Sequence, residues 1–448
     1  MNAHLQKLWD LLRGSLWFVP MVLAITATVL AISAVAFDRT LPHDWLANST
    51  LRWLVYSGDA QGASLVLSTI AGSAITIAGT VFSMTLVALS LASQQLGPRL
   101  LRNFMRDRVN QVVLGTFIST FIYGLLVLRT IRRQDEFVPH LAVTLGVGLA
   151  LASLAVLIYF IHHVSVSIQA DAVINRVGRE LLEQIDRLFP HDGKAAVTHG
   201  PTAHERLPAD FDASAAVVAA DADGYLQQVD LQSLVKLAQA QNLQLRLEHQ
   251  PGDFLITGQP LLRVWPPATL NDTLRGRLLQ HCATGDQRTS IQDFEFVVRE
   301  LVEIAVRALS PGINDPFTAM ACLDRLGAAL YRLAQRELPS PERLDPSGRL
   351  RLVVPAFSFV ATAELAFTQI RQNARGSSAV HERLLDTLLS VAAVARRPGD
   401  RTVLREQAGL MAQAARAGVS EPAERRGVEQ RHAAAVALLS NVRARRPG

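Results

Sequence analysis

Residues 64–93 read SLVLSTIAGSAITIAGTVFSMTLVALSLAS, a run of apolar, small and hydroxyl-bearing residues without a charged side chain. A helix of about 20 apolar residues is long enough to cross the hydrocarbon core of a bilayer. This run exceeds that length. It therefore predicts a membrane-spanning helix that tilts or extends beyond the bilayer.

Three further apolar runs predict spans at Leu16–Phe37, Val112–Leu128 and Leu141–Ile161. None of them contains a charged residue, which is the usual composition of a segment that faces lipid. Charged and polar residues fill the rest of the 448-residue chain. The sequence thus predicts an integral membrane α-helical part with four transmembrane helices, followed by a water-soluble part.

Basic residues in the short connections predict the orientation. The N-terminal flank and the second connection hold Lys7, Arg13, Arg99, Arg102, Arg106 and Arg108. Both are therefore expected in the cytoplasm, which gives a multi-pass membrane protein with cytoplasmic N- and C-termini. The thiols of Cys282 and Cys322 suit a reducing cytoplasm. The third connection disagrees, because it places Arg129, Arg132 and Arg133 outside, but the second connection is more basic.

The second span carries a stripe of residues spaced by three or four positions, which places them on one face of a helix. The stripe consists of Ser68, Gly72, Ile75, Gly79, Ser83, Leu86 and Ser90. One interpretation is helix packing, since small residues let backbones approach closely and hydroxyls bond across helices. The other is a pore lining built by several copies of the chain. The two interpretations are compatible.

The basic connection after this span also has two interpretations. Arg99, Arg102, Arg106 and Arg108 either set the orientation and contact anionic lipid heads, or form a basic cytoplasmic mouth that attracts anions to a pore. The net charge of +5 does not predict a nucleic-acid partner, because the arginines are scattered among acidic residues.

The predicted domain boundaries are 1–165 for the transmembrane domain, 166–190 for a connector helix, 191–210 for a linker, 211–267 for a small α/β module and 268–448 for a cytoplasmic helical domain. The module has five predicted strands, at 215–220, 225–229, 243–248, 254–257 and 260–265, and a helix capped by Asp230. Its phrase PGDFLITGQPLLRV resembles the strand pairs of small barrel-like modules that carry lipoyl or biotin groups. No lysine stands at the turn, so we expect a structural or ligand-sensing module. The fold class is then a transmembrane helical domain with a cytoplasmic α+β domain, namely a five-stranded barrel-like module and a helical bundle.

Helical patterns continue at 270–284, 293–309, 316–336, 351–373, 379–396, 400–417 and 422–443. Between two of them lies the phrase SPGINDPFTA, residues 310–319. Its Ser310, Pro311 and Gly312 predict a turn, Asn314 or Asp315 caps the next helix, and Pro316 occupies the first helical position. Thr318 offers a further oxygen, and Phe317 is expected to pack inward.

This corner has three interpretations: a structural turn, a contact between subunits, or an active site. Catalysis finds the least support, because one Asn–Asp pair offers few of the oxygen ligands that a hard cation needs. The sequence also contains no glycine-rich phosphate loop, nucleophile elbow or paired-histidine metal motif. We therefore expect no enzymatic activity, no cofactor and no bound metal.

The corner phrase, RTSIQDFEFVVRELVEIA at 288–305 and TIAGTVFSMTLVALSLASQQLGPRLL at 76–101 together identify a resemblance. The chain is similar to the bacterial predicted-membrane-protein family catalogued as domain of unknown function 2254. The resemblance implies an inner-membrane protein with an N-terminal membrane part, and it supplies no catalytic residues.

Two functions then remain. The first is an oligomeric ion channel or small-solute pathway, lined by the second span and regulated by the cytoplasmic domain. The alternative is a membrane-anchored sensor or scaffold whose cytoplasmic domain binds a ligand or protein partner. The expected partners are the lipid bilayer, further copies of the chain, and ions or a small solute.

Overall fold

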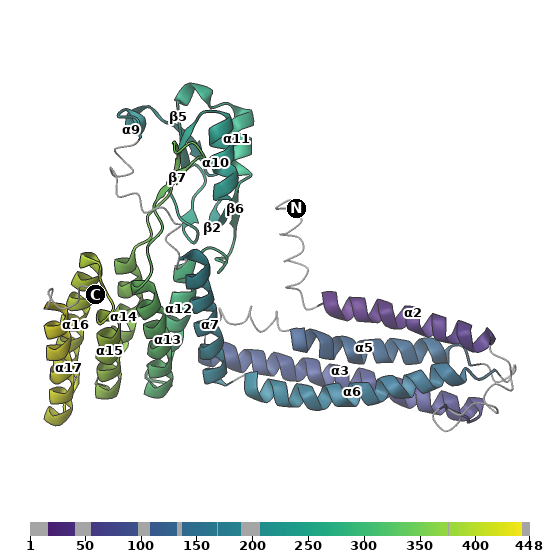
Figure 1. Cartoon of the computed structure of the whole chain (residues 1–448). Helices are drawn as coiled ribbons and strands as arrows, with labels where there is room; N and C mark the ends of the chain where they lie inside the picture. Colours follow the sequence, from purple (N-terminus) through teal and green to yellow (C-terminus); the bar gives the residue numbers. More distant parts are fainter. Residues whose placement is uncertain are drawn as a thin grey trace, which may run out of the picture. The chain divides into compact units, whose positions relative to one another are not determined.

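The computed structural model describes residues 17–40, 55–96, 108–131, 137–167, 169–189, 207–374 and 376–440 (Figure 1). The chain forms two compact units, Met1–Ala172 and Val173–Gly448. Membrane helices make up the first, and a mixture of helices and sheets makes up the second.

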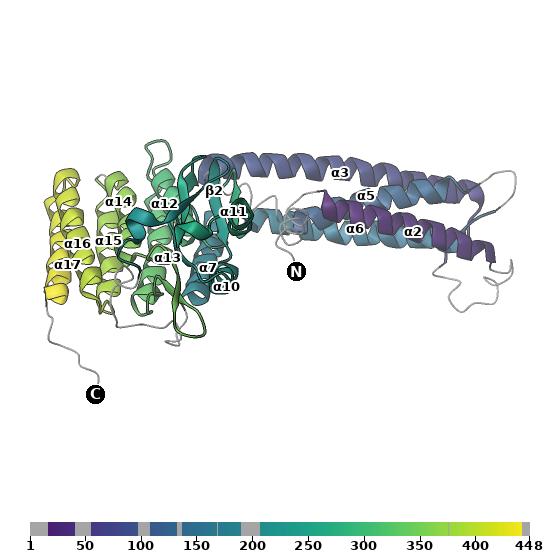
Figure 2. The same cartoon turned by 90° about the horizontal axis from the view of Figure 1, so that it is seen from above.

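The membrane unit contains four helices that are long and apolar enough to cross a bilayer. They are α2 (Phe18–Thr40), α3 (Ala60–Leu96), α5 (Arg108–Leu128) and α6 (His140–Ser167). The four predicted spans are thus confirmed as candidate membrane helices. Figures 1 and 2 show them running side by side. Helix α3 has 37 residues, or about 55 Å at 1.5 Å per residue, so it is longer than a bilayer core is thick.

Helix α5 is the best buried of the four, and its glycines permit close contacts with its neighbours. A Cβ atom added to Gly115 would lie 3.0 Å from the Cα of Pro20 in α2. At Gly124 it would lie 3.2 Å from the Cβ of Ala71 in α3. The hydrophobic effect does not drive helices together inside lipid. The helices associate through close van der Waals packing instead, which small residues at these points permit.

Hydrogen bonds join α6, the last of the four membrane helices, to α2 and α5. The hydroxyls of Thr120 in α5 and Ser153 in α6 lie 2.9 Å apart, and Tyr123 donates to the carbonyl oxygen of Ala142 over 2.8 Å. The carboxylate of Asp38, near the end of α2, accepts from the backbone N–H groups of Leu141 (3.1 Å) and Ala142 (2.8 Å). These N–H groups belong to the first turn of α6, where they have no partner inside their own helix.

The second unit begins with α7 (Ala170–Leu188, of which Val173 onward belongs to it) and continues into an α/β region. Its elements are α9 (Phe211–Ser214), β1 (Ala216–Ala219), β2 (Gly224–Val229), α10 (Leu231–Ala240), β3 (Gln244–Leu247), β4 (Phe254–Leu255), β5 (Pro260–Trp265), η2 (Pro267–Thr269), α11 (Asp272–Leu279), β6 (Cys282–Gly285), β7 (Glu342–Leu344) and β8 (Leu350–Val353). Asp230 caps α10 as predicted, accepting from the backbone N–H of Ser233 over 3.0 Å.

The strands form two open sheets, so the structure does not bear out the five-stranded barrel-like module. One sheet has the order β1-β5-β3-β8-β7 and the other β4-β2-β6. Two of the predicted helices are also shorter than expected. Residues 282–285 pair with β2, and residues 350–353 pair with β3 in parallel, so both stretches are strands. Three of the four β8 residues are apolar and all four are buried, including Arg351, so this short stretch looks like the start of the apolar run that follows it.

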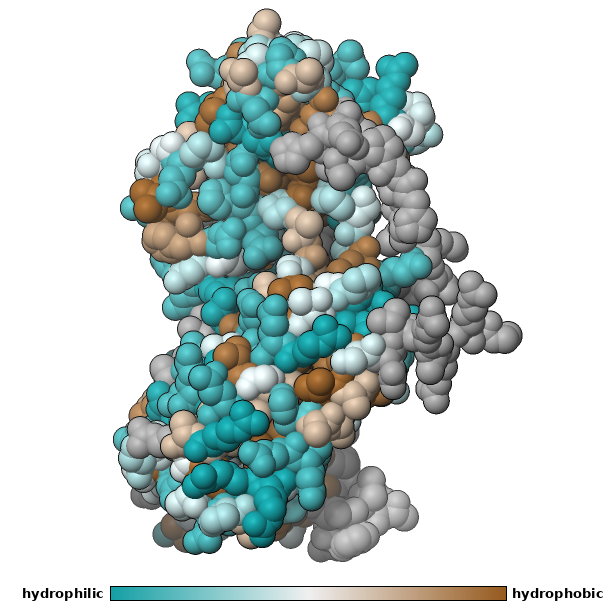
Figure 3. Space-filling view, turned by 90° about the vertical axis from the view of Figure 1, so that its left-hand side faces the viewer, coloured by the Kyte–Doolittle hydropathy of each residue, from teal (hydrophilic) through white to brown (hydrophobic). Residues whose placement is uncertain are grey.

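The remaining helices are α12 (Phe294–Ala308), α13 (Pro316–Ala334), α14 (Phe359–Asn373), α15 (Ser378–Ala392), α16 (Pro398–Gly418) and α17 (Pro422–Ser440). Phe359 and Phe367 of α14 are fully buried among them. Figure 3 views the molecule from the side of α16 and α17, and hydrophilic side chains predominate over these helices. A polar outer face suits the terminal layer of a stack of helices in water.

Candidate functional site

Helix α3 has two faces of different character. Its packed face is lined with small apolar residues that are buried against the other membrane helices: Ala63, Leu67, Ala71, Ala74, Ala78, Val81 and Ala88. Its open face contains all seven predicted pore-lining candidates, and all are exposed: Ser68, Gly72, Ile75, Gly79, Ser83, Leu86 and Ser90. A Cβ atom added to Gly72 or Gly79 would meet nothing within 4 Å. The protomer therefore does not use this stripe for its internal packing.

The hydroxyls on and beside the open face donate to their own helix. Ser68 donates to the carbonyl oxygen of Leu65 over 2.9 Å, and Thr76 and Thr80 donate to those of Gly72 (2.8 Å) and Thr76 (3.1 Å). Each proton is directed inward, which leaves the oxygen lone pairs free to point away from the helix axis. The open face thus offers acceptor oxygens between glycines.

The predicted basic mouth is described only in part. Arg99, Arg102 and Arg106 lie outside the described residues, whereas Arg108 begins α5 and is exposed. Asn110 and Gln111, which follow it, are buried. The side-chain amide of Asn110 finds no hydrogen-bond partner within the described residues. Sequence reasoning missed these amides, because they precede the apolar run by which the span is recognised.

The predicted corner joins α12 to α13 and follows the expected chemistry. Asn314 takes a positive φ of 50°, which asparagine tolerates better than most residues. Asp315 caps α13: its Oδ1 accepts from the backbone N–H groups of Phe317 and Thr318, both at 3.1 Å, and its Oδ2 accepts from the Thr318 hydroxyl at 2.6 Å. Pro316 stands at the first helical position.

The tip of the corner is apolar and points to solvent. Residues 311–314 are exposed, and Phe317 is 76% exposed, so the expectation that Phe317 packs inward is wrong. Phe317 lies at the start of α13, before Ala319, the first buried residue of that helix. Within the described part of the chain, no group of three or more His, Cys, Asp or Glu residues could hold a metal ion.

Replacing Asp315 by alanine is expected to destabilise the second unit by about 0.5–2 kcal/mol, since two backbone N–H groups lose their acceptor. Asp315→Asn keeps a capping oxygen and serves as the matched control. Urea unfolding of the two variants measures the difference. An equal loss of unfolding free energy in Asp315→Ala and Asp315→Asn would show that the negative charge of Asp315, and not its capping hydrogen bonds, stabilises the unit.

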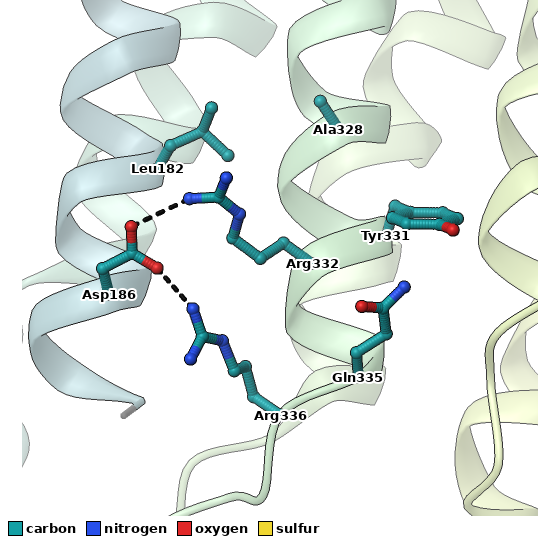
Figure 4. A pocket seen from close by; sticks show the side chains of 7 residues that line it. All are labelled: Leu182, Asp186, Ala328, Tyr331, Arg332, Gln335 and Arg336. Carbon is teal, nitrogen blue, oxygen red and sulfur yellow. Dashed lines mark hydrogen bonds and ion pairs between the residues drawn. The ribbon is translucent and has the colours of Figure 1, made fainter. Parts of the chain in front are cut away.

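A groove between α7 and α13 was not foreseen from the sequence. It has a volume of about 750 Å³, and Leu182, Asp186, Ala328, Tyr331, Arg332, Gln335 and Arg336 line it. In Figure 4 both arginines of α13 point toward Asp186 of α7. The spacing of Arg332 and Arg336 by four residues was a readable signal of a shared helix face, but nothing in the sequence indicated that Asp186 lies opposite.

The two thiols offer no nucleophile. Cys322 is fully buried. Burial, reinforced by the negative charge of Asp221, raises the pKa of Cys282 to about 12. A thiol with this pKa is almost entirely protonated at neutral pH, and it is the thiolate that reacts.

Comparison with known proteins agrees with the four apolar helices. Residues 13–390 match the model of a family described as predicted membrane protein, domain of unknown function 2254. Uncharacterized proteins of Mycobacterium bovis and Mycobacterium tuberculosis are 33% identical to the chain over 423 residues, which cover 93% of this chain and 79% of each relative. No solved structure matches. The chain therefore belongs to this family of predicted membrane proteins.

Proposed function

We propose that the protein is an oligomeric channel or small-solute pathway of the bacterial inner membrane, with the open face of α3 lining the pathway between copies. The observation that carries this proposal is the exposure of the whole glycine and hydroxyl stripe while the alanine face of the same helix is packed. A helix that only anchors a protein in lipid has no need of a stripe in which five of seven residues are serine or glycine. Such residues are typical of surfaces that contact another helix or line water.

The interior of the protomer supports a pathway between copies rather than through one copy. Phe117 and Tyr123 of α5 and Phe160 of α6 are at most 1% exposed, so bulky side chains fill the space among the four helices. The spans in α2, α3 and α6 are buried over only 22–28% of their most apolar windows, against 50% for α5. The outer helices thus leave wide surfaces for lipid and for further copies.

The second unit takes a regulatory role in this proposal, with both termini in the cytoplasm. Helix α7 follows α6 after only two residues, so it is the first soluble element after the membrane. No enzymatic step is proposed, because neither the corner nor the thiols supply a reactive group. The alternative is a membrane-anchored sensor or scaffold, and the groove beside α7 is the observation that favours it.

Disulfide cross-linking tests the assembly. Ser83→Cys, in a background with Cys282→Ala and Cys322→Ala, is expected to form dimers in membranes on mild oxidation, since Ser83 lies on the open face. Ala78→Cys is the matched control: Ala78 is 4% exposed on the packed face and is expected not to cross-link.

Flux through liposomes tests the pathway itself. Purified Ser83→Cys protein is expected to pass ions or a small solute, and a bulky thiol reagent is expected to block this flux. If flux persists after every Ser83→Cys thiol has been labelled, α3 does not line the pathway. Absence of both cross-linking and flux would favour the sensor or scaffold.

A further inference from the structure

The groove between α7 and α13 contains an unbalanced cluster of charges. Arg332 donates to Oδ2 of Asp186 over 2.8 Å, and Arg336 donates to Oδ1 of the same carboxylate. Two guanidinium groups thus share a single carboxylate, which leaves one positive charge in excess. Arginine keeps its charge at any physiological pH, so the excess is permanent.

The burial of the three groups is uneven. The side chain of Arg336 is 4% exposed, whereas those of Arg332 and Asp186 are 40% and 51% exposed. Burying a charge is costly unless it is well paired, so the site retains a desolvated guanidinium at its base. The carboxylate that neutralises it stands at the rim, in contact with water, where an ion pair contributes only about 0–1 kcal/mol.

The rest of the groove has the size and character of a small-molecule site. Its volume of about 750 Å³ is of the order occupied by small organic ligands. Leu182 and Ala328 give it apolar walls. Tyr331 and Gln335 also line the groove from α13, and Figure 4 shows their side chains directed away from Asp186.

We propose that this groove binds a small, free anion with two or more negative charges, such as a phosphate-bearing metabolite, and that the anion replaces Asp186 as the partner of Arg332 and Arg336. A phosphate group matches two guanidinium groups in both charge and geometry, because arginine pairs with phosphate through parallel hydrogen bonds. The apolar walls then contact the remainder of the ligand.

Binding has a mechanical consequence for α7. This helix is joined to α13 near its start by Asn175, which accepts from Arg325 over 2.5 Å, and near its end by Asp186. An anion that takes both arginines releases the end of α7 and leaves its start attached. Regulation of transport by this release rests on the proposed function, whereas binding of the anion does not.

Isothermal titration of the full-length protein in detergent, with pyrophosphate at constant ionic strength, tests the site. Asp186→Asn is expected to bind pyrophosphate about fivefold more tightly than the native protein, because the anion no longer competes with the carboxylate for the arginines, a difference of about 1 kcal/mol. Arg332→Gln is expected to weaken binding by a similar factor. Arg332 is chosen because its half-exposed side chain can be changed without opening the core.

Glu183→Gln supplies the matched control. It removes the same charge from the same helix, but Glu183 lines a different groove, with Arg179 and Ile291. Its affinity for pyrophosphate is expected to stay within about twofold of the native value. Equal gains from Asp186→Asn and Glu183→Gln would reduce the effect to general electrostatics and overturn the proposal.

Two further outcomes would overturn the proposed anion site. Absence of pyrophosphate binding in Asp186→Asn, with its melting temperature intact, would exclude the site. Glycerophosphoglycerol, the headgroup of phosphatidylglycerol with a single charge, is expected to bind far more weakly. If it binds as tightly as pyrophosphate, the site recognises a lipid headgroup and the assignment to a free multivalent anion is wrong. Titration in detergent tests anion binding, and flux in liposomes tests transport. A negative result in one experiment therefore does not contradict the proposal tested by the other.

Discussion

Phenylalanine in place of Gly79 is expected to reduce flux through the reconstituted protein about tenfold or more, because a pathway's conductance depends steeply on its narrowest diameter. Gly79 lies at the middle of the open face of α3, and a Cβ atom there would meet nothing within the protomer. In the proposed assembly the aromatic ring therefore extends into the space between copies. It should leave the packing of its own four helices unchanged.

The neighbouring residue provides the control. Ala78 faces the packed side of α3 and is 4% exposed, so Ala78→Phe forces a ring into a filled interface. That variant is expected to lower the melting temperature in detergent, whereas Gly79→Phe should not. Gly79→Ala should keep most of the flux. Unchanged flux in a correctly assembled Gly79→Phe protein would contradict the placement of the pathway along this face.

The second large effect concerns the stability of the helical region. Phe367→Ala is expected to cost about 3–5 kcal/mol, since truncating a buried phenylalanine removes its transfer free energy and leaves a cavity. Phe367 is fully buried in α14. A lower urea midpoint for the second unit of the full-length protein, with an unchanged slope, would measure the loss.

Phe317→Ala makes the same chemical change at an exposed position. Its side chain contributes little burial at 76% exposure, so the expected effect is within about 0.5 kcal/mol. Similar losses for the two phenylalanines would mean that Phe317 is covered in the folded protein. A partner copy bound over the corner would then be the first explanation to test.

The contrast between these phenylalanines illustrates what the sequence could predict. Helix positions followed from long apolar runs and from capping residues: Asp230 caps the helix that it was expected to cap, and of the two candidates Asn314 and Asp315 it is Asp315 that caps α13. The direction of the Phe317 side chain did not follow. It depends on how α12 and α13 meet the rest of the unit, and local residue order carries little information about that.

Long-range pairing marks the other limit. Strand β8 pairs in parallel with β3, with Leu245 opposite Leu352, across more than a hundred residues of intervening chain. A single sequence gives no sign of such a pair, and the apolar Leu350, Leu352 and Val353 of β8 resemble the start of the helix that follows. The groove was missed for the same reason, because Asp186 and the arginines of α13 are even farther apart in the chain.

The hydrogen bonds of Asp38 bear on how the membrane unit is made. Of the four membrane helices, the ribosome synthesises α2 first and α6 last. The carboxylate of Asp38 at the end of α2 therefore has no amide partners until α6 has been synthesised. Chains that stop before α6 keep an unpaired acid at the edge of the membrane. The first and last of the four membrane helices thus complete one another, because the carboxylate of α2 and the free N–H groups at the start of α6 find their partners only when both helices are present.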